Sequence, residues 1–201
     1  MTSLDLQSNR LGLEGGKAIA SALTGNAVLT SIDVGYNRIG KEQVLSLVSI
    51  FKEKDQMKSV GLAGCNLGVD GAEAVADYVS GSAVLKSIDL SSNQLCGVNP
   101  AGNGTYDLSG IQALAAALGS GSAVLTNLNL AHNALCGVSI YGRGTYDPSG
   151  IQALAAAIGS GRAVLKSIDL RNNFLERQQG VQEVQEMQDA LKGRSDFKLQ
   201  V

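Results

Sequence analysis

Residues 85–95 read Leu-Lys-Ser-Ile-Asp-Leu-Ser-Ser-Asn-Gln-Leu, and this spacing of aliphatic residues and asparagine recurs along the whole chain. The shared template is Leu-x-x-Leu-x-Leu-x-x-Asn-x-Leu, with other aliphatic residues in place of some leucines and Cys65 in place of one asparagine. Six copies begin at Met1, Leu29, Met57, Leu85, Leu125 and Leu165. Self-similarity of this kind is the signature of a protein built from stacked repeats.

The spacing between copies defines the domain organisation. The first three intervals are 28 residues long and the last two are 40 residues long. We therefore predict a single domain of six repeats, two of which carry an insertion. The predicted repeats span 1–28, 29–56, 57–84, 85–124, 125–164 and 165–201, with insertions at about 99–110 and 139–150.

Each repeat contains a strand pattern followed by a helix pattern. Positions 3 to 6 alternate as a short strand does, and pairs such as Val75 and Val79 have the i, i+4 spacing of one helix face. Glycines such as Gly25 and Gly121 then stop the helices, because glycine readily takes the left-handed conformation at a helix end. Parallel strands lie about 4.8 Å apart and packed helices 8–10 Å apart, so the stack curves with its strands inside. The sequence predicts a curved α/β solenoid.

These strings, with their 28-residue period, resemble the ribonuclease-inhibitor class of leucine-rich repeats over essentially the whole chain. The class includes ribonuclease inhibitor, the Ran GTPase activator and the repeat domains of NOD-like receptors. The resemblance implies a domain that binds proteins, while the identity of the partner does not follow from the fold.

The two ends of the chain differ. Val181, Val184, Met187 and Leu191 are spaced to share one face of a last helix, and the alternating residues 197–201 predict a closing strand. At the other end, Met1 already occupies a core position of the first repeat, although terminal repeats of solenoids need a polar cap. We expect either a fragment of a longer protein or self-association through the uncapped N-terminal edge.

Composition narrows the functional class. The 201 residues carry a net charge of −2 with 4% aromatic residues and no tryptophan, which does not favour binding to nucleic acid or to an anionic membrane. We find no signal peptide and no apolar run long enough to span a membrane. Three cysteines are too few for a disulfide framework, so a reducing, cytoplasmic location is expected. No cofactor or metal site is predicted.

The exposed strand positions form columns across the predicted concave face. The fifth position holds Asp5, Asp33, Gly61, Asp89, Asn129 and Asp169, and the second holds Thr2, Thr30, Lys58, Lys86, Thr126 and Lys166. Neighbouring carboxylates repel each other mildly, and a basic partner or a cation would relieve this repulsion. The alternative is that aspartate is simply the consensus residue of the repeat. The asparagine column is predicted to be structural, with its side chains satisfying backbone groups in the turns.

The two insertions occupy equivalent places in adjacent repeats, so they are expected to lie side by side. Both contain Gly-Thr-Tyr-Asp, in which Asp107 and Asp147 suit helix caps and Pro148 suits the first helical position. In a purely structural interpretation, Tyr106 and Tyr146 pack on the neighbouring loop. In the alternative interpretation, the paired loops form a rim that recognises a partner.

We find no constellation that predicts catalysis. His132 is the only histidine, and no activated nucleophile accompanies it. The sequence therefore predicts a non-enzymatic scaffold that binds a protein through the concave face, the insertion rim or both. The alternatives are a regulator of a small GTPase and a sensor fragment of a larger receptor. The candidate contact residues are Asp5, Asp33, Tyr36, Asp89, Asn129, His132, Asp169 and Arg171 on the concave face, and Tyr106, Tyr141, Arg143 and Tyr146 on the rim.

Overall fold

The computed structural model describes residues 1–99, 101–139, 141–175 and 181–201. Pro100 and Ile140, which fall within the two insertions, lie outside the described residues. The strands are β1 (Ser3–Asp5), β2 (Ser31–Asp33), β3 (Ser59–Gly61), β4 (Ser87–Asp89), β5 (Asn127–Asn129), β6 (Ser167–Asp169) and β7 (Lys198–Gln200). The helices are α1 (Gly12–Thr24), α2 (Lys41–Lys52), α3 (Gly68–Gly81), α4 (Ser109–Gly119), α5 (Ser149–Gly159) and α6 (Val181–Ala190).

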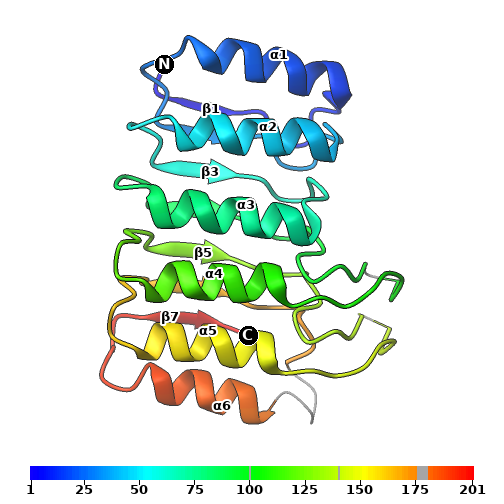
Figure 1. Cartoon of the computed structure of the whole chain (residues 1–201), viewed down its shortest axis with the longest axis vertical. Coiled ribbons are helices and arrows are strands. Elements are labelled where there is room, and N and C mark those ends of the chain that lie inside the picture. The colour runs from blue at the N-terminus through cyan, green and yellow to red at the C-terminus, as the bar shows by residue number, and fades with distance from the viewer. Residues whose placement is uncertain (100, 140, 176–180) are drawn as a thin grey trace.

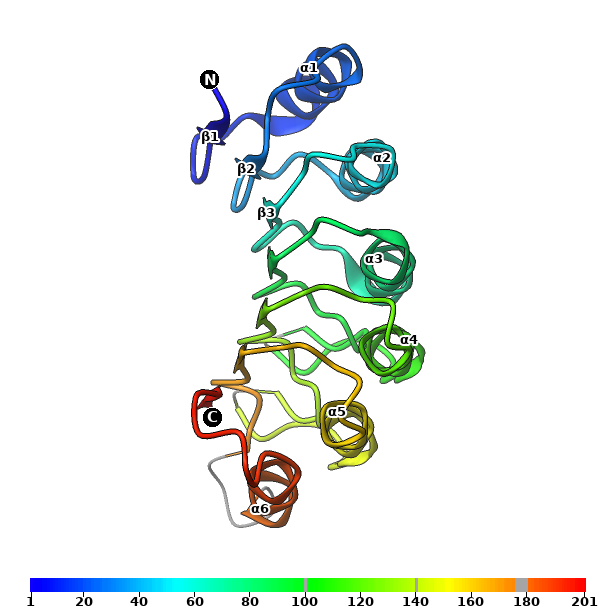
Figure 2. The same cartoon turned by 90° about the vertical axis from the view of Figure 1, so that its left-hand side faces the viewer.

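Strands and helices alternate, as the repeat pattern predicted. The strands form one parallel sheet in chain order, and equivalent residues pair across it, for example Leu4 with Ile32 and Ile32 with Val60. The helices stack beside one another along one side of the sheet, on the outer side of an arc (Figures 1 and 2). The protein is therefore an α/β solenoid with strands on the concave side. Among the described residues, no helix is long and apolar enough to cross a membrane.

The core is a continuous aliphatic column between sheet and helices. Each strand contributes its middle residue, such as Ile88 (2% exposed), and the following leucine, such as Leu90 (0% exposed). Helices contribute the residues at i, i+4 spacing, including Leu114 and Leu118. Each repeat thus buries its apolar residues against its neighbours, as stacked repeats require.

The turn after each strand has a backbone conformation that the template does not reveal. Positions eight and ten take positive φ in successive repeats even where the residue is not glycine, as at Tyr36 (55°) and His132 (59°). The left-handed region is unfavourable for most side chains. The column of buried asparagines stabilises these turns: Asn93 Nδ2 donates to the Leu62 and Ser91 carbonyls, while Asn133 Oδ1 accepts the Asn93 N–H. The asparagine column is structural, as predicted.

Two details of the sequence prediction are wrong. Val181 was expected on the buried face of the last helix, but it is 61% exposed, and Glu183 is buried instead. Val181 is the first residue of α6, and the helix turns Glu183 toward the core in its place. Gly25 follows α1 with a φ of −91° and not a left-handed conformation, because the helix there ends in a right-handed turn. Gly121 does have the expected left-handed conformation, with a φ of 81°. The closing strand is present as β7.

Candidate functional site

The aspartate row comprises Asp5, Asp33, Asp89 and Asp169, with Asn129 in the equivalent place of β5. In each case the side-chain Oδ1 accepts the backbone N–H two residues later, at 2.8–3.0 Å. This bond begins the turn that leads out of the strand, and short polar side chains are favoured where they satisfy such backbone donors. Every member of the row therefore has a structural task, which explains why aspartate or asparagine recurs at this position.

Asp33 is in a different environment from the other aspartates. Gly61 lies beside it on β3, and a Cβ placed on this glycine would come within 2.2 Å of Asp33 Cγ. The Asp33 carboxylate therefore fills the space that a side chain at position 61 would need. Burial raises the pKa of Asp33, and the charges of Asp5 and Asp89 act in the same direction, against the opposing hydrogen bond from Gly35.

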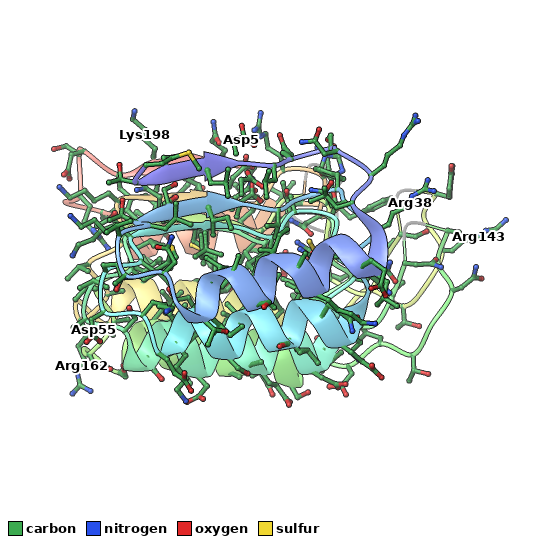
Figure 3. All side chains as sticks on the ribbon, turned by 90° about the horizontal axis from the view of Figure 1, so that it is seen from above. Asp5, Arg38, Asp55, Arg143, Arg162 and Lys198 are labelled. Carbon is green, nitrogen blue, oxygen red and sulfur yellow. The ribbon has the colours of Figure 1, made fainter. Side chains whose placement is uncertain are left out.

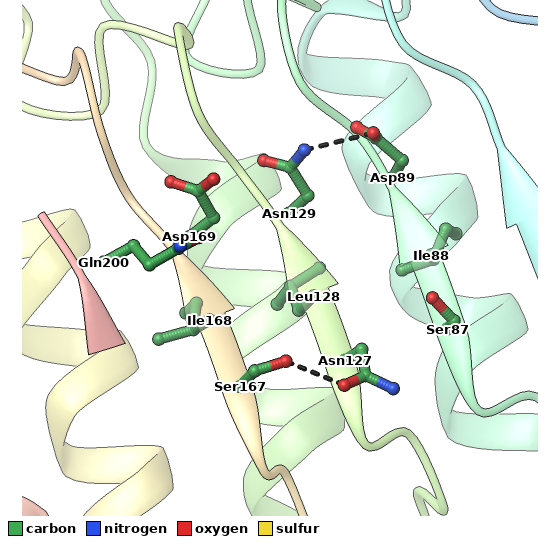
Figure 4. Close-up of a pocket in the computed structure, with 10 residues that line it drawn as sticks. All are labelled: Ser87, Ile88, Asp89, Asn127, Leu128, Asn129, Ser167, Ile168, Asp169 and Gln200. Carbon is green, nitrogen blue, oxygen red and sulfur yellow. Dashed lines mark hydrogen bonds between the residues drawn. The ribbon is translucent and has the colours of Figure 1, made fainter. Parts of the chain in front are cut away.

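In the C-terminal half of the row, Asp89 and Asp169 have side-chain partners within the chain, and Asp169 alone is neutralised by an ion pair. Asn129 Nδ2 donates to Asp89 Oδ2 at 3.0 Å, and the two side chains point toward each other (Figure 4). Arg171 forms a two-pronged ion pair with Asp169, with Nη2 to Oδ2 at 2.6 Å. Burial raises the Asp169 pKa, but the hydrogen bonds and charge of Arg171 outweigh it, so the net shift is downward. Asp89, Asn129 and Asp169 line a shallow hollow of about 230 Å³ above β4, β5 and β6.

Because the pKa of Asp33 is raised and that of Asp169 is lowered, replacing each by asparagine should change the free energy of unfolding in opposite directions. Asp33→Asn keeps the oxygen acceptor, as Asn129 does naturally, and removes a charge that the fold disfavours. We expect it to raise the free energy of unfolding at pH 7 by up to about 1 kcal/mol. Asp169→Asn breaks the ion pair with Arg171 and should lower the free energy of unfolding by about 0.5–1 kcal/mol.

Urea unfolding at several pH values checks this prediction. Because its pKa is raised, Asp33 is most compatible with the fold when protonated, so the Asp33→Asn advantage should disappear below pH 3.8, the ordinary aspartate value. The stabilisation that ionised Asp169 gives the folded state is fully present above the ordinary aspartate pKa, and it is lost as pH falls through the lowered pKa of Asp169. If both variants changed the free energy of unfolding in the same direction at pH 7, the opposite pKa shifts of Asp33 and Asp169 would be contradicted.

The second group of concave candidates lies in the turns after the strands. The Tyr36 ring lies across Gly64, where a Cβ would come within 2.4 Å of Cδ1, and its hydroxyl is 3.1 Å from Ser92 Oγ, two repeats away. Tyr36 is nevertheless 45% exposed. His132 Nε2 is 3.0 Å from Asn172 Nδ2 in the next repeat. Ser92 and His132 occupy equivalent positions of adjacent repeats, so the Tyr36 hydroxyl and His132 lie along the same row of turns.

The two insertions are internally braced hairpins that lie side by side. A Cβ on Gly104 would come within 2.0 Å of the Gly97 carbonyl oxygen, and one on Gly102 would meet Arg143 Cβ of the second insertion at 2.7 Å. Asp107 Oδ1 accepts the Ser109 N–H at 2.8 Å and Asp147 Oδ1 accepts the Ser149 N–H at 2.9 Å, so each aspartate binds the first residue of its helix. The N-cap positions themselves are Leu108 and Pro148, one residue later than predicted. Both hairpins project from the same edge of the solenoid (Figure 1).

The four rim candidates divide into two inward and two outward residues. The Tyr106 hydroxyl donates to the Leu135 carbonyl at 2.9 Å and also lies 3.2 Å from the Asp147 carbonyl, so it fastens the first insertion to the next repeat. The Tyr146 hydroxyl is buried beside Cys136 and Glu183. Tyr141, by contrast, is 71% exposed. Arg143 is also exposed and extends outward at the insertion edge (Figure 3).

Sequence reasoning missed Glu183, which is 4% exposed at the base of the second insertion. Its only signal was a charged residue among the core positions of the last helix. The three cysteines are free and buried, and burial raises the pKa of each thiol to about 12. They are therefore poor nucleophiles and poor metal ligands at neutral pH. Within the described residues, no group of three or more His, Cys, Asp or Glu side chains is placed to hold a metal ion.

The N-terminal edge has an apolar surface. On the sheet side, β1 pairs only with β2 among the described strands. Leu4, Leu6 and Leu11 are half-buried there, while Met1 is 80% exposed and Leu13 is 47% exposed.

Comparison with known families agrees with this architecture. A family model described as Leucine Rich repeat matches residues 1–20 and 25–47, and a second, described as Leucine Rich Repeat, matches residues 84–104. Together with the strand–helix repeats, these matches define the class: the chain is a leucine-rich repeat protein.

A solved structure similar to this chain is the tropomodulin C-terminal domain from Caenorhabditis elegans. It matches with a TM-score of 0.58 and 12% sequence identity, over 89% of this chain and 96% of that chain. At this identity, the similarity concerns the fold alone.

Proposed function

We propose that this leucine-rich repeat protein is a non-enzymatic scaffold that binds another protein, with the insertion rim as its principal contact. The observation that carries the proposal is that some rim residues fix the insertions to the solenoid while others are exposed to solvent. Tyr106 and Asp107 hold the hairpins in place, while Tyr141 and Arg143 extend from them into solvent. Tyrosine and arginine are enriched among the residues that dominate binding energy at protein interfaces.

The aspartate row supports the proposal in a secondary way. Each member already holds a turn, and Asp169 is neutralised by Arg171, so the row offers a partner fewer free groups than its composition suggests. Its charge is concentrated on Asp5, Asp33 and Asp89, toward the N-terminal half. We propose that these carboxylates, with Tyr36, Asn129 and His132, guide a partner that is anchored on the rim.

The test compares three forms of the protein in capture of partners from cells of its source. Tyr141→Ala/Arg143→Ala removes the outward rim side chains, and Asp33→Asn/Asp89→Asn/Asp169→Asn removes charge while keeping the turn acceptors. We expect the rim variant to lose the captured protein and the concave variant to weaken its capture. Equal capture by all three forms, at unchanged thermal stability, would contradict the proposal.

We also propose that the protein self-associates through its apolar N-terminal edge. The solution mass of each form, measured across a range of concentrations, tests self-association through the N-terminal edge, with Leu13→Glu as the variant that should abolish it.

Acceleration of GTP hydrolysis across a panel of small GTPases would favour the regulator alternative, and continuation of the gene upstream would favour the receptor fragment. The buried free thiols fit the proposed cytoplasmic location.

A further inference from the structure

Four exposed lysines lie at the beginnings of β3, β4, β6 and β7, at the opposite end from the aspartate row, and Thr126 takes the equivalent place of β5. The backbone ladder fixes this arrangement: the Lys86 N–H donates to the Lys58 carbonyl at 2.8 Å, and the ladder continues through Thr126 to Lys166. Lys198 pairs in register with Ser167, so it lies one residue further along the sheet than the other three lysines. Lys198 extends from the concave side at the far left of the sheet (Figure 3). We call Lys58, Lys86, Lys166 and Lys198 the lysine row.

The lysine row differs from most other lysines in its electrostatics. On the helix side, Lys17, Lys41, Lys52 and Lys192 each pair with an acidic residue of this chain, while Lys54 Nζ donates to the Thr24 and Asn26 carbonyls. Within the described part of the chain, no member of the lysine row is in an ion pair, and all four side chains are exposed. Lys86 Nζ has a weak contact of 3.4 Å with the Val124 carbonyl. Like charges on adjacent strands repel, so an anionic partner would be stabilised here.

We propose that the lysine row binds an acidic polypeptide segment that crosses the strands along the axis of the solenoid. The row extends from β3 to β7, which at about 4.8 Å per strand corresponds to roughly 19 Å. An extended segment rises about 3.3 Å per residue, so roughly six residues would cover this length, with acidic side chains on one side. This inference rests on the proposed protein-binding function and adds the chemistry of the partner.

The aspartate row limits the ligand to something narrow. Asp89 and Asp169 lie three residues further along their strands than Lys86 and Lys166, which separates the two rows by about 10 Å on β4 and β6. A nucleic-acid duplex or a membrane surface is wider than this separation and would meet the carboxylates. A single polypeptide segment can contact the lysines alone, or place basic side chains over the aspartates at the same time. The charge pattern therefore favours a protein ligand.

A defined probe tests this proposal without knowledge of the natural partner. We would titrate the full chain into a fluorescein-labelled peptide of alternating glutamate and serine, eight residues long, and follow fluorescence anisotropy. We expect weak binding that falls as salt increases, because exposed charges are screened. Lys86→Gln/Lys166→Gln should weaken binding at least fivefold.

The matched control is Lys17→Gln/Lys192→Gln, which changes the net charge equally but removes lysines from the helix side. It should leave peptide binding within twofold of the wild type. Equal weakening by both double variants, no binding by the wild type, or tighter binding of an eight-nucleotide single-stranded RNA would overturn the proposal. Tyr141→Ala/Arg143→Ala should bind the peptide normally, so failure of the rim proposal is distinguishable from failure of this one.

Discussion

Replacing Asn133 with alanine is expected to lower the free energy of unfolding by about 3–5 kcal/mol. Asn133 is 1% exposed, and its Nδ2 donates to the carbonyls of Leu90, Leu130 and Ala131 at 2.9–3.2 Å. Its Oδ1 accepts the Asn93 N–H at 2.8 Å. Alanine would leave these buried backbone groups without partners in two successive turns, and each unsatisfied group costs about 1–3 kcal/mol.

Urea unfolding followed by far-UV circular dichroism measures this loss, and the chain provides its own control. Asn9 occupies the same template position in the first repeat, but it is exposed, so water can replace its side-chain hydrogen bonds. Asn9→Ala should therefore cost less than about 1 kcal/mol. If the two variants lost similar stability, the buried asparagine column would not be the main support of the turns.

Gly144→Ala is expected to have the next largest effect, about 2–4 kcal/mol, concentrated in the second insertion. Gly144 has a φ of 114°, which L-residues rarely adopt, and an added Cβ would come within 2.1 Å of the Gly137 carbonyl oxygen. A backbone oxygen cannot move aside as a flexible side chain can. The two sides of the hairpin would have to separate, which should make the insertion susceptible to limited proteolysis.

Gly142→Ala is the control for Gly144→Ala. Gly142 also has a positive φ, of 74°, but nothing lies within 4 Å of an added Cβ. Only the backbone penalty remains, which is about 1 kcal/mol. The proteolysis rate of the insertion should therefore rise much more for Gly144→Ala than for Gly142→Ala. Similar rates would show that close approach of the two sides does not hold the hairpin.

Much of the candidate surface could be placed from the sequence, although the roles of its residues could not. The columns of equivalent positions, including the aspartate row, follow directly from the repeat register, since parallel pairing places equivalent residues side by side. The direction of Tyr106 was left open between packing and recognition. Its hydroxyl bonds to Leu135, 29 residues further along the chain, which no local pattern reveals.

The sequence by itself determined the repeat, the strand and helix alternation, and the structural role of the asparagines, because each depends on spacing within one repeat. Only the tertiary structure decided which charges are neutralised and which remain available. Lys41 pairs with Asp70, 29 residues further along the chain, whereas no member of the lysine row is in an ion pair among the described residues. Charge pairing depends on which side chains the stacking brings within about 4 Å, and a linear pattern does not contain that distance.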